Sequence, residues 1–458
     1  MYRERLSSLF AVAALLAGVA APTANALPPV KHVFVIVLEN KNFDETFGTA
    51  SKAPYLAKDL VGQGEMLSQY YGIGHLSLDN YIALVSGQSP NPLTQSDCQA
   101  YQDMLPGTIG ADGQAMGLGC VYPSAVKTVA NQLEDKGLTW GGYMEDMANN
   151  PTQAPTCRHP DLGTQDTTQS PKTGDQYAAR HNPFVYFHSI IDTPSCAAND
   201  VPLDRLPAAL ETAAATPNLV FITPNLCNDG HDTPCVDGKP GGLVSANGFL
   251  QTWVPRILGS PAYKQDGLLI VTFDESESGA ESCCTTSAPN TPNQGGTSAG
   301  SGGGRVGAVL LSPWVTPNTT SAKKFNHYSL LRSVEDVFGL PHLGYAGVPS
   351  TPAFGDDLFT GAGPGKVTPP ACTSSTLPAK KGTLPRGTLI ASARVSGGKL
   401  KLRLTHAADL SLRAGAKRFG PRRGKACATL SVAIPKGAHT VTVKATVHGA
   451  RETRTLRA

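Results

Sequence analysis

Unbroken runs of apolar residues recur along the first three quarters of the chain. The clearest are VFVIVL at 33–38, NLVFI at 218–222 and GLLIVTF at 267–273. A run that is apolar at nearly every position is typical of a strand in a parallel sheet covered on both faces. Further strands of the same sheet are predicted at 65–71, 138–143 and 306–311.

Segments with helical character lie between these runs. The stretch 77–86 places Leu78, Ile82 and Val85 on one helical face, and Gly87 is expected to end the helix. Other helices are predicted at 54–61, 125–136, 206–214, 246–258 and 329–338. Strands that alternate with helices over about 330 residues predict an α/β sandwich.

A different pattern follows near the C-terminus. Residues 361–386 are rich in Gly, Pro, Ser and Thr and are predicted to form a linker. Beyond them Leu400, Leu402 and Leu404 alternate with basic residues, so the hydrophobic period becomes two. That period predicts a small antiparallel β module, most simply a sandwich, over residues 387–458. The domain before the linker spans 27–360 and includes a low-complexity stretch, 276–304, that we expect to be a mobile loop.

The N-terminal residues form a targeting signal. Arg3 and Arg5 precede an apolar run, and Ala24-Asn25-Ala26 has the small residues of a cleavage site. We therefore expect residues 1–26 to be a signal peptide and the protein to be secreted, either extracellular or associated with the cell wall. The ten cysteines are then expected to form disulfides. Proximity in sequence favours Cys98–Cys120 and Cys227–Cys235, and it leaves the other pairings open.

The charge is divided unevenly along the chain. From Lys380 onward, 18 Lys and Arg residues face only Asp409 and Glu452, a net charge of +16. Because the whole chain carries +3, the remainder carries −13. The basic module suits an anionic membrane or cell-wall surface, although a solubilising role is an equal alternative. Phe419 is its only aromatic residue, which argues against nucleic-acid binding.

Polar residues follow three of the predicted buried strands. Glu39-Asn40 and Asp274-Glu275 end two of them, and the loop 225–232 (NLCNDGHD) ends a third. The carboxyl ends of parallel strands meet at one edge of a sheet, so these groups are expected to converge. Carboxylates brought together repel one another, and a hard divalent cation removes that penalty. We therefore expect a divalent ion at this edge, and oxygen ligands suit magnesium, calcium or manganese.

Ser77 is the candidate nucleophile. It is expected to be the N-cap of the helix at 77–86, where unpaired N–H groups and the helix dipole stabilise an alkoxide or a phosphate. A lone serine at a helix start is more often only a cap, and the surrounding residues change that interpretation. Four histidines and an arginine beside predicted element ends can bind phosphate or transfer protons: His75, Arg180, His181, His231 and His327.

These motifs resemble a known family. The blocks are Leu38-Glu39-Asn40-x-x-Phe43-Asp44, His75-x-Ser77-x-x-Asn80-Tyr81, Arg180-His181-x-Pro183-Phe184, Asn228-Asp229-x-His231-Asp232, Thr272-x-Asp274-Glu275 and His327-Tyr328. Together they resemble the bacterial phosphoesterase family, which holds secreted acid phosphatases and non-haemolytic phospholipases C. The short acid phosphatases, including those acting on phosphatidylinositol 3-phosphate, are the closer likeness.

The resemblance implies a fold and a set of roles. The fold would be an alkaline-phosphatase-like α/β/α sandwich, here with a small C-terminal all-β module. The implied catalytic residues are Ser77, His75, His181, His231 and Asp232. The implied substrate-binding residues are Arg180, Asn80 and His327, and the implied metal ligands are Glu39, Asn40, Asp274 and Glu275. A Glu-Asn pair and an Asp-Glu pair differ from the ligands of the two-zinc enzymes of that superfamily, which favours one ion.

The leading hypothesis is a secreted, metal-assisted phosphomonoesterase acting on a small-molecule or lipid-headgroup phosphate ester. A phospholipase C or phosphodiesterase on the same fold is the alternative, although no apolar lid for a diacylglycerol is evident between Ser77 and His181. The third hypothesis is a non-catalytic surface-binding protein.

Overall fold

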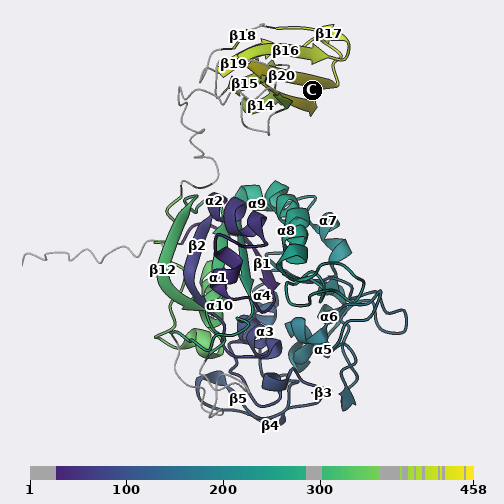
Figure 1. Ribbon diagram of the computed structural model, residues 1–458, viewed down its shortest axis with the longest axis vertical. Helices are drawn as coiled ribbons and strands as arrows, with labels where there is room; N and C mark the ends of the chain where they lie inside the picture. Colours follow the sequence, from purple (N-terminus) through teal and green to yellow (C-terminus); the bar gives the residue numbers. More distant parts are fainter. Residues whose placement is uncertain are drawn as a thin grey trace, which may run out of the picture. The chain divides into compact units, whose positions relative to one another are not determined.

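The computed structural model describes the chain as two units, Met1–Gly363 and Pro364–Ala458, and each is considered by itself (Figure 1). The described residues are 27–284, 302–355, 357–361, 363, 382–383, 390–396, 399–404, 408–420, 423–424, 429–447 and 450–457. The predicted signal peptide, most of the predicted loop 276–304 and almost all of the predicted linker lie outside them. No helix within the described residues has both the length and the apolar character needed to span a bilayer.

An eight-stranded sheet forms the centre of the first unit. Its order is β12-β2-β11-β10-β1-β9-β6-β8. Every pairing is parallel except the two made by β11, so β11 alone runs against the others. The strands are β1 (His32–Leu38), β2 (Glu65–Tyr71), β6 (Trp140–Met144), β8 (Asp200–Pro202), β9 (Leu219–Thr223), β10 (Gly267–Phe273), β11 (Ala308–Leu311) and β12 (Thr319–Asn326).

The two edge strands were not predicted, because neither has an apolar run. β8 has three residues, and β12 reads TTSAKKFN. The central strands match their apolar patterns: all seven side chains of both β1 and β10 are buried. Neighbouring side chains of a strand point to opposite faces, so both faces of the sheet are covered. The predicted α/β fold is therefore confirmed.

The helices of the first unit pack in two groups. α3 (Ser77–Ser86), α4 (Val129–Asp135) and α10 (His327–Phe338) pack against one another, and α8 (Gly242–Gly259) packs against α9 (Pro261–Asp266) and the turn η1 (Tyr55–Leu60). The shorter helices are α1 (Phe43–Phe47), α2 (Val61–Gln63), α5 (His188–Ile191), α6 (Pro194–Asn199) and α7 (Leu206–Ala209). Two small antiparallel pairs are β3 (Ala100–Tyr101) with β7 (Thr164–Gln165), and β4 (Leu105–Ile109) with β5 (Ala115–Leu118).

Several helix boundaries differ from the predicted ones because capping determines them. α4 begins at Val129 instead of residue 125, since Thr128 and Asn131 form a capping box. α10 begins at His327 instead of Ser329, because the Asn326 side chain accepts a bond from the Ser329 N–H. α7 ends at Ala209 instead of residue 214, where the Thr216 hydroxyl donates to the Ala209 carbonyl.

Four disulfides join described cysteines. Cys98–Cys120 and Cys227–Cys235 confirm the two predicted pairings. Cys157–Cys196 and the adjacent pair Cys283–Cys284 complete the set.

The second unit is built from β-strands alone among its described residues. Three strands pair in the order β14-β15-β19, and the second sheet has the order β13-β21-β20-β16-β17, with β18 paired to β16. Leu400 and Leu402 of one sheet share a core with Leu412 and Val443 of the other, as a sandwich requires. The strands are β13 (Gly382–Thr383), β14 (Ile390–Ser396), β15 (Lys399–Leu404), β16 (Ala408–Ala414), β17 (Lys417–Arg418), β18 (Arg423–Gly424), β19 (Thr429–Ala433), β20 (Thr440–Val447) and β21 (Ala450–Arg457).

A buried acid on α10 makes stability depend on pH. Glu335 is fully buried, and its Oε1 accepts one bond from the Leu343 N–H. Burial raises its pKa from 4.5 to about 9. The folded state therefore holds a proton that the unfolded state releases above about pH 4.5. Stability is lost as pH rises from about 4.5 to 9, by up to about 1.4 kcal/mol per pH unit from this group.

We expect Glu335→Gln to flatten this dependence, because glutamine stays neutral and keeps the bond to Leu343. Urea unfolding at pH 5, 6, 7 and 8 measures the slope, and the exposed Glu211→Gln serves as the control. Equal slopes for wild type and Glu335→Gln would show that Glu335 ionises normally.

Candidate active site

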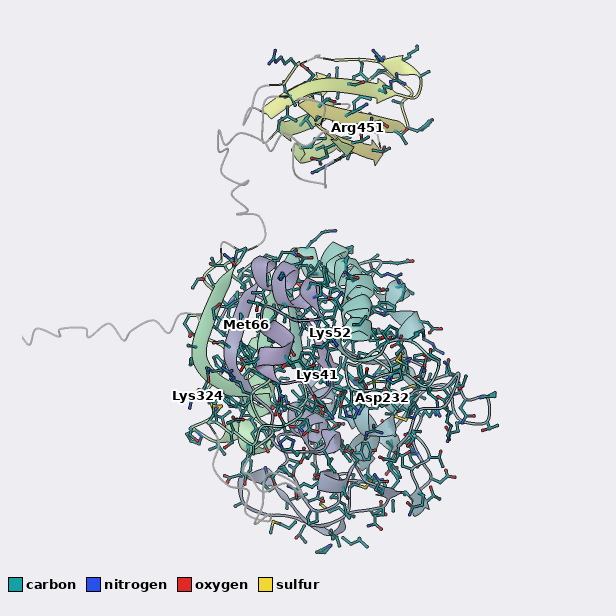
Figure 2. All side chains as sticks on the ribbon, in the orientation of Figure 1. Lys41, Lys52, Met66, Asp232, Lys324 and Arg451 are labelled. Atoms are coloured by element: carbon teal, nitrogen blue, oxygen red, sulfur yellow. A yellow bond between two sulfur atoms is a disulfide. The ribbon has the colours of Figure 1, made fainter. Side chains whose placement is uncertain are left out.

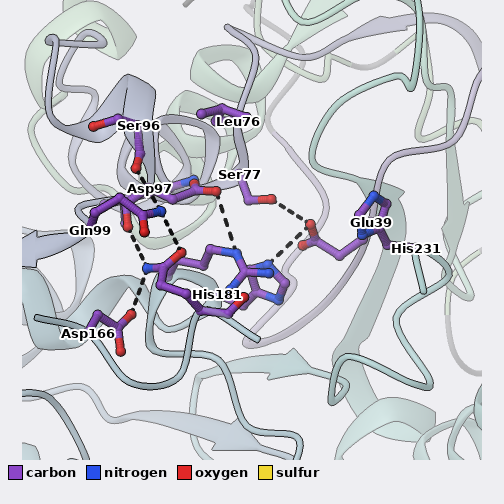
Figure 3. Close-up of polar contacts among 12 residues, drawn as sticks. Glu39, Leu76, Ser77, Ser96, Asp97, Gln99, Asp166, His181 and His231 are labelled. Carbon is purple, nitrogen blue, oxygen red and sulfur yellow. Dashed lines mark hydrogen bonds and ion pairs between the residues drawn. The ribbon is translucent and has the colours of Figure 1, made fainter. Parts of the chain in front are cut away.

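Ser77 is the first residue of α3, and Leu76, with φ of 74°, is the N-cap instead of the predicted Ser77. The hydroxyl is thereby free of a capping bond. It donates to Glu39 Oε2 at 2.7 Å (Figure 3). Ser77 thus lies in the positive first turn of a ten-residue helix with its hydroxyl directed at a buried acid.

The loop before Ser77 is held by the side chain of Asn80. Asn80 Oδ1 accepts bonds from the N–H groups of Ile73 and Gly74, and Nδ2 donates to the carbonyls of Gly74 and Leu76. These four bonds occupy the amide completely. Asn80, predicted to bind substrate, instead positions the backbone that leads into Ser77.

At its other end α3 stops as predicted, at Gly87. This residue has φ of +67°, and a Cβ there would lie 2.3 Å from the Leu343 carbonyl oxygen. Only glycine fits this turn without displacing the loop that packs against it.

The sheet register brings three acids together at one edge. Leu38 of β1 pairs with Phe273 of β10, so Glu39 and Asp274 follow their strands at the same level. The backbone ladder continues beyond the strands: the Asp274 N–H donates to the Leu38 carbonyl, and the Glu39 N–H donates to the Asp229 carbonyl. The three strand ends predicted to converge therefore do so, although the loop after β9 contributes Asp229 as its innermost acid.

Buried oxygen atoms at this edge are left without partners. Among the described residues, no hydrogen bond reaches Asn40 Oδ1, Asp229 Oδ2 or Asp274 Oδ2. Burial raises the pKa of Glu39 well above 4.5, and the charges of Asp274 and Asp229 raise it further. Burial also raises the pKa of Asp229, and that of Asp274 to about 6. Unpaired oxygens and acids that resist ionisation are what a bound hard cation would satisfy.

The four predicted metal ligands differ in whether their oxygen atoms are free to bind an ion. Among the described residues, Asn40 Oδ1 and Asp274 Oδ2 have no partner. Glu39 accepts bonds from the Ser77 and Tyr81 hydroxyls, and Glu275 contacts the His75 ring and accepts from the Leu76 N–H. In the described parts of the chain, the sets of three His, Cys, Asp or Glu ligand atoms lying within 4.8 Å of one another are Cys157-Cys196-Asp200 and Cys227-Cys235-Asp237. Both sets contain a disulfide. An ion at the strand ends would therefore rely on the Asn40 amide besides two carboxylates.

Two of the predicted histidines are already paired. The His75 ring bridges the Glu275 carboxylate and the Gly279 carbonyl. The fully buried His327 ring bridges the Tyr70 hydroxyl and the Asp274 carbonyl. Burial lowers the pKa of His327 to about 4, so the ring is neutral. His327 thus holds the Asp274 backbone instead of reaching substrate.

His181 is the histidine next to Ser77. Its Nε2 lies 3.3 Å from Glu39 Oε2 and its Nδ1 3.7 Å from Asp229 Oδ2, and neither contact has hydrogen-bond geometry. Burial lowers its pKa well below 6.5, and the charge of Arg180 adds to the effect. The Tyr81 ring stacks on it at 5.3 Å, and the Tyr81 hydroxyl donates to Glu39. A neutral His181 is therefore held with an N–H available for a ligand.

Arg180 is tied into the wall of the site. Its Nε lies 3.6 Å from Asp97 Oδ2, and Nη1 donates to the Gln169 carbonyl (Figure 3). Asp97 Oδ1 in turn accepts from the N–H of Leu78, the residue after Ser77. Arg180 therefore fixes the start of α3 through Asp97, and direct phosphate binding would require it to exchange partners.

His231 and Asp232 form the accessible rim. His231 Nδ1 lies 3.2 Å from Asp232 Oδ1, and the His231 side chain is 47% exposed. Figure 2 labels Asp232. A separate cavity of about 290 Å³, lined by residues that include Asn42, Ser276 and Gly279, adjoins the carbonyl that His75 contacts.

The roles of several residues of the site were missed from the sequence. Asp229 and Tyr81 belong to two of the motif blocks but were assigned no role, and Asp97 had no signal beyond its residue type. Asp79, in the first turn of α3, is fully buried, and neither carboxylate oxygen has a partner among the described residues. Burial raises its pKa well above 3.8, as expected of a neutral acid.

The family model that matches this chain and the known proteins that it is similar to agree with one another. Residues 51–341 match the model of the phosphoesterase family. Similar proteins include a phosphate-repressible acid phosphatase of Penicillium chrysogenum, 28% identical over 72% of this chain and 66% of that protein. A phosphatidylinositol-3-phosphatase of Mycobacterium tuberculosis is 26% identical over 73% of this chain and 86% of its own length. A probable acid phosphatase of Kluyveromyces lactis is 26% identical over 69% of this chain and 59% of its own length. The chain thus spans less than two thirds of each of the two fungal relatives.

Among solved structures, an alkaline phosphatase superfamily protein from Vibrio parahaemolyticus aligns with 91% of this chain and 79% of its own. The TM-score is 0.40 at 10% identity.

The four hydrogen bonds between the Asn80 side chain and the loop before Ser77 lead to a prediction about kcat. We expect Asn80→Ala to lower kcat at least about tenfold, with a smaller change in KM, because four loop bonds are lost and Ser77 is no longer fixed. Asn80→Asp keeps the two bonds that Oδ1 accepts, and its kcat should lie between those of wild type and Asn80→Ala. Asn247→Ala removes a comparable bond to the Tyr55 N–H and is the control for lost stability alone. Wild-type kcat in Asn80→Ala would refute a positioning role.

Proposed function

The chain belongs to the phosphoesterase family, and on that basis we propose that it is a secreted, metal-assisted phosphomonoesterase of the acid phosphatase type with Ser77 as its nucleophile. The observation that carries the proposal is the Ser77 hydroxyl itself. It is buried at a helix start, 2.7 Å from Glu39, beside acids that converge from three strands.

Ser77 Oγ would attack phosphorus, and the bond from Ser77 to Glu39 sets the direction of that oxygen. Glu39 Oε2 accepts the hydrogen bond of the Ser77 hydroxyl and is therefore placed to receive its proton as the bond to phosphorus forms. The positive end of the α3 dipole lies at Ser77 and favours the negative phosphate oxygens, although the Leu78 N–H of that turn is already bonded to Asp97.

Two histidines suit different oxygens of the ester. Neutral His181, buried beside Ser77, can donate one N–H to a phosphate oxygen. His231, at the accessible rim with Asp232 beside its Nδ1, is better placed than the fully engaged His75 to protonate the leaving oxygen.

A divalent ion fits the residues present. Glu39, Asn40 and Asp274 would hold it, and the unpaired Asn40 and Asp274 oxygens support that assignment. When bound, such an ion supplies positive charge that lowers the cost of the clustered acids and of the phosphate. Magnesium, calcium and manganese suit these oxygen ligands better than zinc.

The substrate class is a phosphate monoester, either of a small molecule or of a lipid headgroup. The acid phosphatase relatives and the relative named for phosphatidylinositol 3-phosphate support monoesters. A phospholipase C or phosphodiesterase remains the second candidate because it would use the same nucleophile. Four disulfides support export to an oxidising compartment.

We expect Ser77→Ala to lower kcat on p-nitrophenyl phosphate at least about 10³-fold while the protein stays folded. Ser86→Ala, in the same helix, removes a bond to the Ile82 carbonyl and one from the Gln88 N–H, and its activity should stay close to wild type. Wild type should also hydrolyse p-nitrophenyl phosphate faster than p-nitrophenylphosphorylcholine.

Retention of more than about a tenth of the activity in Ser77→Ala would exclude this nucleophile. Faster turnover of the phosphorylcholine diester would instead establish the phosphodiesterase alternative.

A further inference from the structure

The β module, the second unit of the chain, presents cations on the outer faces of both its sheets. In β15, exposed Lys399 and Lys401 alternate with buried Leu400 and Leu402. The other sheet exposes basic side chains on four of its strands, and these are Arg413, Lys417, Arg418, Arg423 and Arg451. Figure 2 labels Arg451 on this unit. Because the apolar side chains of both sheets share one core, the two sets of cations point away from each other.

The basic residues of this module are not balanced internally. Arg413 lies directly opposite Arg418 in the β16–β17 register, an arrangement of like charges that costs stability. Of the two acids, Glu452 is buried and bonded to Arg454, and Asp409 lies opposite Arg423. The positive charge of the outer faces is therefore left for an external anion.

We propose that this module binds a flexible phosphate-bearing polymer and so retains the enzyme beside it. Arginine holds phosphate through two parallel hydrogen bonds, which suits the neighbouring Arg413 and Arg418. A flexible chain can pass from one face of the sandwich to the other and contact both sets of cations. This inference is independent of the catalytic proposal.

The distribution of side chains favours a polymer over a membrane. A planar membrane contacts one face of a sandwich at a time, and the cations occupy two. The large apolar side chains that are exposed among the described residues all belong to the first unit. The described part of the β module therefore offers no apolar side chain for insertion between lipids.

Nucleic acid also fits the module poorly. Single-stranded nucleic acid is bound largely by stacking bases on aromatic rings. The module contains one aromatic residue, Phe419, and that side chain is partly buried against the module's own core.

The test uses the full-length protein and immobilised long-chain inorganic polyphosphate. One variant, Arg413→Gln/Arg418→Gln, changes the six-stranded sheet, and another, Lys399→Gln/Lys401→Gln, changes the three-stranded sheet. The control is Lys52→Gln/Lys58→Gln, which removes two exposed charges from the first unit. Each β-module variant should weaken binding roughly ten- to thirtyfold at low salt and reduce its salt dependence, and the control should bind as wild type does.

Activity on p-nitrophenyl phosphate should be unchanged in all three variants, and thermal unfolding should show that each remains folded. Equal binding by wild type and both β-module variants would overturn the proposal. So would tighter binding to phosphatidylcholine–phosphatidylglycerol vesicles or to single-stranded DNA than to polyphosphate. If only one of the two β-module variants bound polyphosphate more weakly than wild type, the proposal that the polymer contacts both faces would be wrong.

Discussion

The close approach of several buried carboxylates around one serine is the constraint on which the rest of the structure depends. Glu39 and Asp274 end adjacent parallel strands at the same level, and Asp229 joins them from the loop after β9. Burial alone raises the pKa of each carboxyl group, and their mutual repulsion raises that of Glu39 further. Buried carboxylates that lie close together destabilise a fold unless a cation or a bound proton neutralises their negative charge. The cluster is therefore a candidate cation site.

Much of the remaining architecture serves to hold that cluster and Ser77 in place. His327 fixes the Asp274 carbonyl from α10, and Asn80 braces the loop that enters α3. Arg180 reaches the start of α3 through Asp97. The sequence predicted these residues to bind substrate, and here each of them contacts the backbone or a side chain next to Ser77 or Asp274. We propose that they position Ser77 and Asp274.

The sequence predicted the parts of the fold that simple patterns control. Apolar runs identified β1, β9 and β10, and the residues after these strands identified most of the acids, because parallel strand ends share one edge. Edge strands such as β12 were missed because a half-exposed strand needs no apolar run. Whether a histidine faces substrate or supports a neighbour was also beyond the sequence. That depends on partners distant in the chain, as for His75 with Glu275 and Gly279.

The central claim is that the clustered acids form a cation site that serves Ser77. Elemental analysis of the purified protein, followed by calorimetric titration of magnesium, calcium or manganese into chelated protein, tests it most directly. The account predicts about one ion per chain, a rise in unfolding temperature on binding, and weakened binding in Asp274→Asn. Full activity in exhaustively chelated protein, with no ion bound and no thermal shift, would contradict it.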